Sequence, residues 1–320
     1  MNNTHEREIV KVATLYYKEG LTQAQIAKRN GVSRSLVSKM LIEARKKGLI
    51  EFFINSEETY SASLEIQLEK QFGLKKAVVV DTKHLSEEEV PKVAAQVAAI
   101  NLKKQFSDGK KIGLSWGKSI REFVDQFSFE SYQDIVFIPL VGGMGADNVE
   151  IHSNQLCYEM AKKTRGKAKY LYAPALIQNP ELKKDIEENP AIKEVLNEGK
   201  CVDLAILGTS SMVRTENNMY KIGYLSNDDF DLLENLGVVG DINSRFFNQA
   251  GEEVKAPQND SVIGLSISDI RKIPDSIVIA YDSFKWDSVW IICQNKIINQ
   301  LVTTDVIAEK VLAFAQNNKK

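Results

Sequence analysis

Long apolar stretches are missing from this sequence. No run approaches the roughly 20 consecutive apolar residues that a helix needs to span a bilayer. The first ten residues, MNNTHEREIV, are polar and charged where a secretory signal would place an apolar segment. The sequence therefore predicts a chain that neither crosses a membrane nor is exported, and that stays in the cytoplasm.

Cysteine is also scarce, with three residues among 320. Cys157, Cys201 and Cys293 lie far apart and form no Cys-x-x-Cys pair, which argues against a disulfide framework and against a zinc site. We interpret all three as small buried apolar residues and predict no metal and no cofactor. Internal repeats and low-complexity tracts are absent too, so the composition is that of an ordinary globular protein with a large and a small domain.

The net charge of −2 hides an uneven distribution. Residues 1–50 hold ten Lys and Arg against four Asp and Glu, a balance of +6, whereas the remaining residues hold 31 against 39, a balance of −8. Positive charge gathered in one small segment is suited to neutralising the phosphates of a nucleic acid.

Apolar spacing and capping residues predict three helices in this basic segment. Apolar residues recur at helical spacing over residues 6–18. Thr22 is a suitable N-cap for a helix over residues 23–29, and Ser33 for one that runs to about residue 47.

The connection between the second and third helices indicates a helix-turn-helix. Asn30-Gly31 predicts a tight turn, and the apolar residues on either side are spaced to pack together. These residues are Leu21, Ile26, Ala27, Val32, Val37 and Leu41. The exposed face of the third helix is then free to enter a DNA major groove. A helical hairpin whose basic face is merely solvated is the alternative.

Polar residues at the starts of these two helices are the candidate DNA contacts. Thr22, Gln23 and Gln25 are placed to bind backbone phosphate with the positive end of the helix dipole. The first half of the third helix offers side chains to base edges and phosphates. That set is Ser33, Arg34, Ser35, Ser38 and Lys39.

The region after the third helix predicts a domain boundary. Residues 49–54 alternate as a short strand that either forms a wing or connects two domains, and residues 55–63 are polar and helix-poor. We therefore expect a DNA-binding domain at 1–54, a linker at 55–62, and a domain at 63–320 for effector binding and oligomerisation.

The rest of the chain alternates helices with short β-branched runs, which is typical of a parallel sheet covered by helices on both faces. Predicted helices include residues 86–106, which open with the capping-box pattern Ser86-x-x-Glu89, and residues 153–163. A hairpin turn is expected at 248–251. The predicted strands are 77–80, 111–115, 134–140, 170–173, 202–207, 261–265, 276–280 and 297–302.

Three glycine-bearing loops follow predicted strands, at the edge where open α/β sheets bind their ligands. In residues 112–119, IGLSWGKS, a strand opens through glycine into a helix whose backbone N–H groups, with two serine hydroxyls and a lysine, would suit a phosphate. Residues 140–145, LVGGMG, and 207–210, LGTS, are similar turns. Each loop by itself could be an ordinary turn.

Taken together, these motifs resemble the SorC family of bacterial sugar-responsive regulators. The resemblance covers almost the whole chain and lies in GLTQAQIAKRNGVSRSLVSKML, GLSWGKSI, PLVGGMG, VGDINSRFFNQAGEEV, IAYDSFKWDSV and LVTTD. It implies a winged helix-turn-helix head joined to a Rossmann-like, parallel-sheet domain similar to sugar-phosphate isomerases. It also implies tetramers whose affinity for operator DNA changes when a phosphosugar binds.

The resemblance also implies the effector contacts. It assigns phosphate contacts to Ser115, Gly117, Lys118 and Ser119, loop contacts to Gly142 and Gly143, sugar contacts to Asp241 and Lys285, and further contacts to Asn154 and Gly208. Two positions depart from the family pattern. Val141 replaces a lysine that forms a Schiff base in one member, which excludes a covalent imine here, and Tyr281-Asp282 replaces a pair of glycines.

The sequence thus predicts a DNA-binding transcription regulator of a carbohydrate-metabolism operon, controlled by a sugar or phosphosugar. Its expected partners are double-stranded operator DNA, the effector and further copies of the chain, as a dimer or tetramer. The alternative is an enzyme of the sugar-phosphate isomerase or deaminase type, which would need a general base near the phosphate loop. We find no compact Asp/Glu/His group in the sequence that supplies one. A third possibility is a protein-interaction module built on an inactive enzyme fold.

Overall fold

The chain divides into two units, of which the smaller spans Met1–Thr59. The computed structural model describes residues 2–49, 59–144 and 148–317. The small unit contains α1 (Asn2–Tyr17), α2 (Gln23–Asn30) and α3 (Arg34–Lys46). Thr22 and Gln25 form a reciprocal capping box at the start of α2, and Ser33 accepts the Leu36 N–H at the start of α3. Gly31 ends α2 at φ 64°, a left-handed conformation that glycine adopts without steric cost.

One apolar core holds these three helices together. Ile9 and Val12 of α1, Ile26 of α2, and Val37 and Leu41 of α3 are all buried in it. Leu21 and Val32, which flank α2, pack against its edge. The predicted helices, caps and packing of this unit are therefore confirmed.

The region between the two units is described only at its ends. Apart from Leu49, the strand predicted at 49–54 lies outside the described residues, as do residues 55–58 of the predicted linker. Helix α4 (Thr59–Phe72) already begins at Thr59, so the expectation that the linker is helix-poor is wrong for its last residues. The helix extends this far because Tyr60 packs against the core and its hydroxyl donates a hydrogen bond to Glu309.

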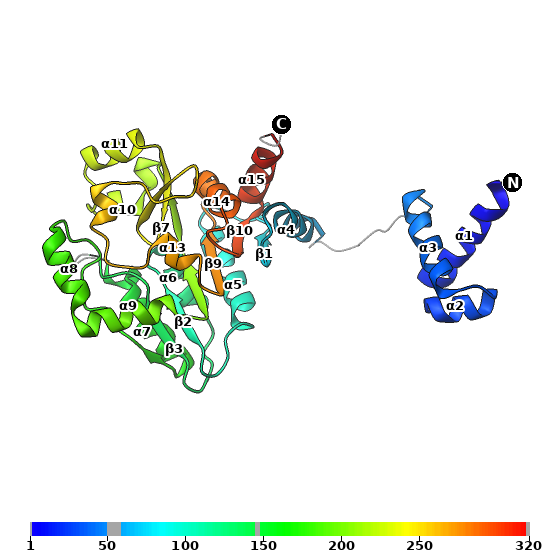
Figure 1. The fold of residues 1–320 in the computed structure, drawn as a ribbon, viewed down its shortest axis with the longest axis horizontal. Coiled ribbons are helices and arrows are strands. Elements are labelled where there is room, and N and C mark those ends of the chain that lie inside the picture. The colour runs from blue at the N-terminus through cyan, green and yellow to red at the C-terminus, as the bar shows by residue number, and fades with distance from the viewer. Residues whose placement is uncertain (1, 50–58, 145–147, 318–320) are drawn as a thin grey trace. The chain divides into compact units, whose positions relative to one another are not determined.

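A sheet of parallel strands forms the centre of the larger unit (Figure 1). Its strands in the described residues are β1 (Lys76–Val80), β2 (Lys111–Leu114), β3 (Val136–Pro139), β4 (Lys167–Ala168), β5 (Leu204–Leu207), β9 (Asp275–Ala280) and β10 (Gln300–Thr304). The order across the sheet is β1-β10-β9-β5-β2-β3-β4. The chain moves outward from β2 to β3 on one side and from β5 to β9 on the other, so the strand order reverses between β2 and β5. Open α/β sheets bind ligands at such a reversal.

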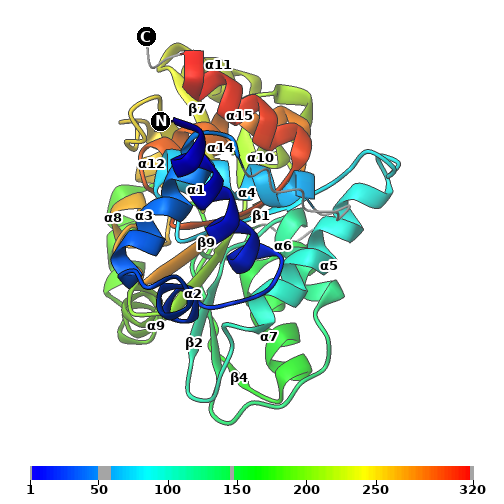
Figure 2. The same cartoon turned by 90° about the vertical axis from the view of Figure 1, so that its right-hand side faces the viewer.

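Helices cover both faces of this sheet. The side chains of one face pack against α5 (Glu89–Lys103), α6 (Lys118–Gln126) and α7 (Ser153–Thr164), which Figure 2 shows gathered on one side. The other face packs against α4, α9 (Pro190–Lys200), α14 (Trp286–Gln294) and α15 (Asp305–Asn317). The predicted α/β class with a covered parallel sheet is confirmed.

A second, antiparallel sheet lies next to the strand-order reversal. It consists of β6 (Thr209–Ser211), β7 (Val238–Ile242) and β8 (Arg245–Asn248), and β6 continues directly from β5 after one residue. An apolar cluster joins this sheet to α10 (Asn218–Lys221) and α11 (Asn227–Asn235). The remaining elements are α8 (Pro180–Glu188), α12 (Pro257–Asp260), α13 (Ile267–Ile270) and the 3-10 turns η1 (Val149–Ile151), η2 (Arg214–Glu216) and η3 (Ser283–Lys285).

Two of the predicted strands do not form. The backbone of Leu171, within the predicted strand 170–173, bonds to the side-chain amide of Asn154 rather than to a neighbouring strand. Residues 261–265 make only single bridges, Val262 to Leu176 and Gly264 to Val141. β-Branched composition alone therefore overestimated the sheet at these places.

Three other predictions have mixed outcomes. The last sheet strand begins at Gln300 rather than at residue 297. The turn predicted at 248–251 forms, because the Gly251 N–H donates to the Asn248 carbonyl at 2.9 Å and Phe247 bridges to Glu253 beyond it. Cys201 is exposed rather than buried, because it directly follows the end of α9. In the described part of the chain, no helix has the length and apolar character that crossing a bilayer would require.

Candidate functional site

The predicted DNA-contacting residues gather on one surface of the small unit. Ser33, Arg34, Ser35 and Lys39 are exposed and Ser38 is half-buried, because the opposite face of α3 carries the core residues. A shallow hollow is lined in part by Thr22, Gln23 and Arg34, which brings the starts of α2 and α3 together. Gln25 is exposed and is held by Thr22 in the capping box.

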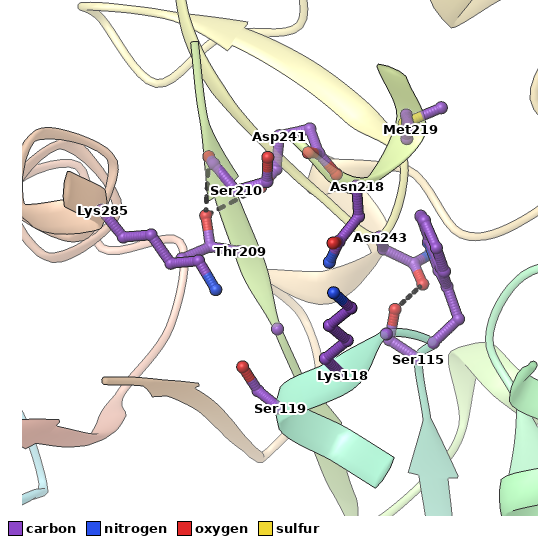
Figure 3. A pocket seen from close by; sticks show the side chains of 13 residues that line it. Ser115, Lys118, Ser119, Thr209, Ser210, Asn218, Met219, Asp241, Asn243 and Lys285 are labelled. Carbon is purple, nitrogen blue, oxygen red and sulfur yellow. Dashed lines mark hydrogen bonds between the residues drawn. The ribbon is translucent and has the colours of Figure 1, made fainter. Parts of the chain in front are cut away.

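A polar cavity lies in the larger unit, where the strand order reverses. Its polar lining comes from segments that are far apart in the sequence: the loop after β2, the start of β6, helix α10, the β7–β8 turn and η3 (Figure 3). Seven of the ten predicted effector residues line it, namely Ser115, Gly117, Lys118, Ser119, Gly208, Asp241 and Lys285.

The loop after β2 brings the start of α6 to this cavity. Gly117 has φ 115°, a conformation that strongly favours glycine, and the helix begins at the next residue. Ser115 is buried and its hydroxyl donates to the Asn243 side-chain oxygen at 2.8 Å. In Figure 3, Lys118 extends from the start of α6 toward Asn218, while Ser119 lies beside it. A helix start with a lysine and a serine can bind the oxygen atoms of a polar ligand.

Asp241 gives the cavity an acceptor that lacks a donor. Only 5% of this residue is exposed, and its Oδ2 accepts the Ser244 N–H at 3.2 Å. Its Oδ1 is buried and makes no hydrogen bond among the described residues, although the Ser210 hydroxyl lies close enough to the carboxyl to affect its pKa. Burial raises the pKa of the carboxyl to about 6, although the Ser244 N–H, the Ser210 hydroxyl and the Lys285 ammonium oppose the shift. A ligand hydroxyl would supply the missing hydrogen bond.

Lys285 is the buried cation of the cavity. The residue is 6% exposed, lies at the end of η3, and its ammonium pairs with the Asp282 carboxylate at 2.7 Å. Figure 3 shows its side chain entering from the side of Thr209. The Thr209 hydroxyl is itself held by the Asp241 carbonyl at 2.7 Å, so the β6–β7 pairing fixes the wall between these two charged side chains.

Several residues that line the cavity were not predicted. They are Trp116, Thr209, Ser210, Asn218, Met219 and Asn243. Thr209 and Ser210 belong to the predicted glycine-bearing loop 207–210, of which only Gly208 was assigned to the site. Asn218 comes from α10, where no local pattern marks it, and only the folding of the chain brings it opposite α6.

Three predicted effector residues do not line the cavity. A Cβ on Gly142 would lie 2.6 Å from the Ala173 carbonyl oxygen, so glycine permits two backbone segments to approach there. The Gly143 N–H donates to the same carbonyl, and the Asn154 side chain is engaged with the Leu171 backbone. The structure gives these three residues contacts with the protein's own backbone.

Replacing Gly142 with alanine should therefore lower stability whether or not an effector is present. The added methyl would have to displace backbone atoms of Ala173 and Pro174, an overpacking that costs about 1–3 kcal/mol. Urea unfolding without ligand measures the effect. The matched control is Gly143→Ala, because the nearest atom to a Cβ there, the Ala173 carbonyl oxygen, is 4.0 Å away. Equal stability of the two variants would contradict this explanation.

The fold and the site together define a class of protein: a transcription regulator in which a helix-turn-helix unit is joined to a sugar-binding α/β domain. The family model "Putative sugar-binding domain" matches residues 56–313. The chain is 31% identical to the sorbitol operon regulator of Klebsiella pneumoniae, over 97% of this chain and 99% of the relative. The chain belongs to the SorC family, as the sequence motifs indicated.

Solved structures agree with this assignment. The full-length sorbitol operon regulator SorC from Klebsiella pneumoniae superposes with a TM-score of 0.75 at 31% identity, covering 96% of this chain and 98% of that one. A DeoR family transcriptional regulator from Listeria monocytogenes gives a TM-score of 0.74 at 42% identity, covering 78% and 99%. The deoxyribonucleoside regulator of Bacillus subtilis (strain 168) is 26% identical over 94% of this chain and 96% of the relative.

Proposed function

We propose that this regulator controls a carbohydrate-metabolism operon and that a sugar or phosphosugar bound in the cavity changes its affinity for operator DNA. The observation that carries the proposal is the cavity at the strand-order reversal, in which a buried carboxylate oxygen of Asp241 has no hydrogen-bond partner within the described part of the chain. An unpaired buried acceptor costs free energy that a ligand hydroxyl would recover. The names of the sorbitol and deoxyribonucleoside regulators support a carbohydrate as the ligand.

The proposed binding to DNA depends on α3. Two or four copies of the helix-turn-helix unit would bind a roughly palindromic operator, with α3 in the major groove and half-sites about one helical turn, or a multiple, apart. A regulator that binds operator DNA would act in the cytoplasm of a bacterial cell. Effector binding would change the spacing of these units through the segment at residues 55–62 and through subunit contacts. A ligand does this only if it binds the two arrangements with different affinity.

An isomerase or deaminase activity is the competing function, and Asp241 bears on it. A buried carboxyl whose pKa is raised to about 6 could act as a general base. We propose instead that it binds a ligand hydroxyl, which accords with relatives that are named as transcription regulators. Turnover of the ligand that stabilises the protein would contradict this.

Thermal unfolding across a panel of sugars, sugar alcohols and their phosphates is the experiment that tests the proposal. A ligand that binds the native state alone raises its stability, by about 2.7 kcal/mol at a hundred times its Kd. We expect one compound or one close group to raise the unfolding temperature and to change operator binding at the same concentration. A panel without any stabilising compound would overturn the proposal.

Ser119→Ala should weaken the effector response while leaving effector-free operator binding unchanged. Ser119 lies at the start of α6 in the wall of the cavity, and its removal deletes a hydroxyl that would contact the ligand. Loss of one such hydrogen bond costs about 0.5–1.5 kcal/mol, or roughly a few-fold in effector concentration. Titrating the effector against a fixed protein–operator complex gives the measurement. An unchanged midpoint would remove Ser119 from the site.

A further inference from the structure

A second compartment adjoins the effector cavity. Lys118, Asn218 and Lys285 line both, and we call the effector cavity the inner compartment and its neighbour the outer compartment. The outer compartment is lined in addition by Arg121, Glu122, Glu216, Lys221, Tyr281 and Asp282. A ligand at the start of α6 would therefore meet charged groups from both compartments.

These charges balance. The lining cations are Lys118, Arg121, Lys221 and Lys285, and the lining carboxylates are Glu122, Glu216, Asp241 and Asp282. Ion pairs already join Lys221 to Glu216 at 2.8 Å, Lys285 to Asp282 at 2.7 Å, and Arg121 to Glu159 at 2.8 Å. Among the described residues, Lys118 is the lining cation that has no carboxylate within 4 Å. A phosphate dianion would thus meet one uncommitted positive charge.

Tyr281 and Asp282 engage the side chains that would otherwise receive a phosphate. Tyr281 is buried beside the Ser119 hydroxyl, which opposes the rise in the pKa of the phenol that burial causes. Asp282 neutralises the buried Lys285. A phosphate at this place would have to displace the Asp282 carboxylate from Lys285 and would then lie close to that carboxylate. Like charges at close range repel.

Besides the donors at the start of α6, the inner compartment presents an acceptor that a ligand donor can satisfy. The unpartnered Asp241 Oδ1 can only accept a hydrogen bond when the carboxyl is ionised. The Asn243 amide is fully engaged, because its oxygen accepts from Ser115 and its nitrogen donates to the carbonyls of Leu140 and Leu265. Hydroxyl groups supply donors, whereas an ionised phosphate supplies none.

We propose that this cavity selects a neutral polyhydroxylated ligand, a sugar or sugar alcohol, and that Asp282 is the residue that excludes its phosphorylated counterpart. The inference rests on the proposed function and narrows its ligand class. Asp282 acts by holding Lys285 in an ion pair and by adding negative charge where a phosphate would enter.

Paired ligands test this on the full-length protein. Kd values for sorbitol and sorbitol 6-phosphate, for other sugars of the panel with their phosphates, and for inorganic phosphate would be measured by calorimetry. Wild type should bind the unphosphorylated member of a pair more tightly and inorganic phosphate weakly. Asp282→Asn keeps the size of the side chain, removes its charge and frees Lys285. The variant should therefore bind inorganic phosphate about tenfold more tightly, and its Kd values for a sugar and for the phosphate of that sugar should differ less than in wild type.

The control is Glu216→Gln, which removes a charge from the same compartment but leaves the Lys285 pair intact. An equal gain in phosphate affinity for both variants would overturn the assignment to Asp282. Tighter binding of the phosphorylated member by wild type would overturn the selectivity while leaving the proposed sugar response in place. Binding of neither member in any pair would count against the sugar response itself, and the inference would fall with it.

Discussion

Replacing Arg34 with alanine should weaken operator binding by about 1–3 kcal/mol, the usual contribution of a side chain that reads a base edge. Arg34 is the first residue of α3, is exposed, and lies beside Thr22 and Gln23 of the preceding helix start. Fluorescence anisotropy with an operator selected from a random DNA library, at fixed salt concentration, measures the loss.

Arg7→Ala is the matched control, because Arg7 is an exposed arginine that belongs to α1 rather than to α3. It should change operator affinity little at the same salt concentration. If Arg34 contacts only phosphate, its variant should instead lose affinity equally for specific and random DNA and show a smaller salt slope. Unchanged affinity for the selected operator would remove Arg34 from the interface altogether.

Asp241→Asn should make the effector-free protein more stable at pH 7.5 and abolish its response to the effector. The carboxyl has its pKa raised from 3.8 to about 6 in the folded state, so folding disfavours the ionised form. Its destabilising effect is absent below the unfolded-state pKa of 3.8, grows as the pH rises from there to the folded-state pKa of about 6, and is complete above it. At pH 7.5 the variant should gain up to about 3 kcal/mol in the free energy of unfolding.

Urea unfolding at several pH values between 4.5 and 7.5 would measure the stability difference between this variant and wild type. The difference should shrink as the pH falls, because the Asp241 carboxyl of wild type then becomes protonated. The other carboxyls titrate equally in both proteins and do not contribute to the difference. Asp185→Asn on the exposed surface of α8 serves as the control and should show no such trend. A difference independent of pH would contradict the raised pKa, and a retained effector response would remove Asp241 from the site.

Local patterns predicted the elements whose contacts are local. Thr22 and Ser33 could be identified as caps because each bonds a residue three positions later. The two failed strands show the limit of such patterns. Residues 170–173 have the composition of a strand, yet the Asn154 side chain takes the hydrogen bonds that a neighbouring strand would provide.

Residues that line the cavity could be predicted where a glycine marked a turn and where a family motif identified a segment far away in the sequence. Gly117 is required by its positive φ, whereas Gly142 is required by close backbone packing, and the sequence looks the same in both cases. Asn218 shows why the lining could not be completed from sequence, because its position depends on how β6, β7 and α10 pack together. The Asp282–Lys285 pair joins residues three positions apart, but its burial is set by the whole fold.

The pairing of β1 with β10 has a consequence for the order in which the protein matures on the ribosome. In the described sheet, β1 has β10 as its single neighbour, so the edge that opens the domain stays unpaired until residues 300–304 have been synthesised. The three helices of the small unit need only contacts within residues 2–49 and can fold long before that. Each nascent chain would therefore carry a finished DNA-binding unit on an incomplete sensor, and premature termination before Gln300 would release a protein without effector control.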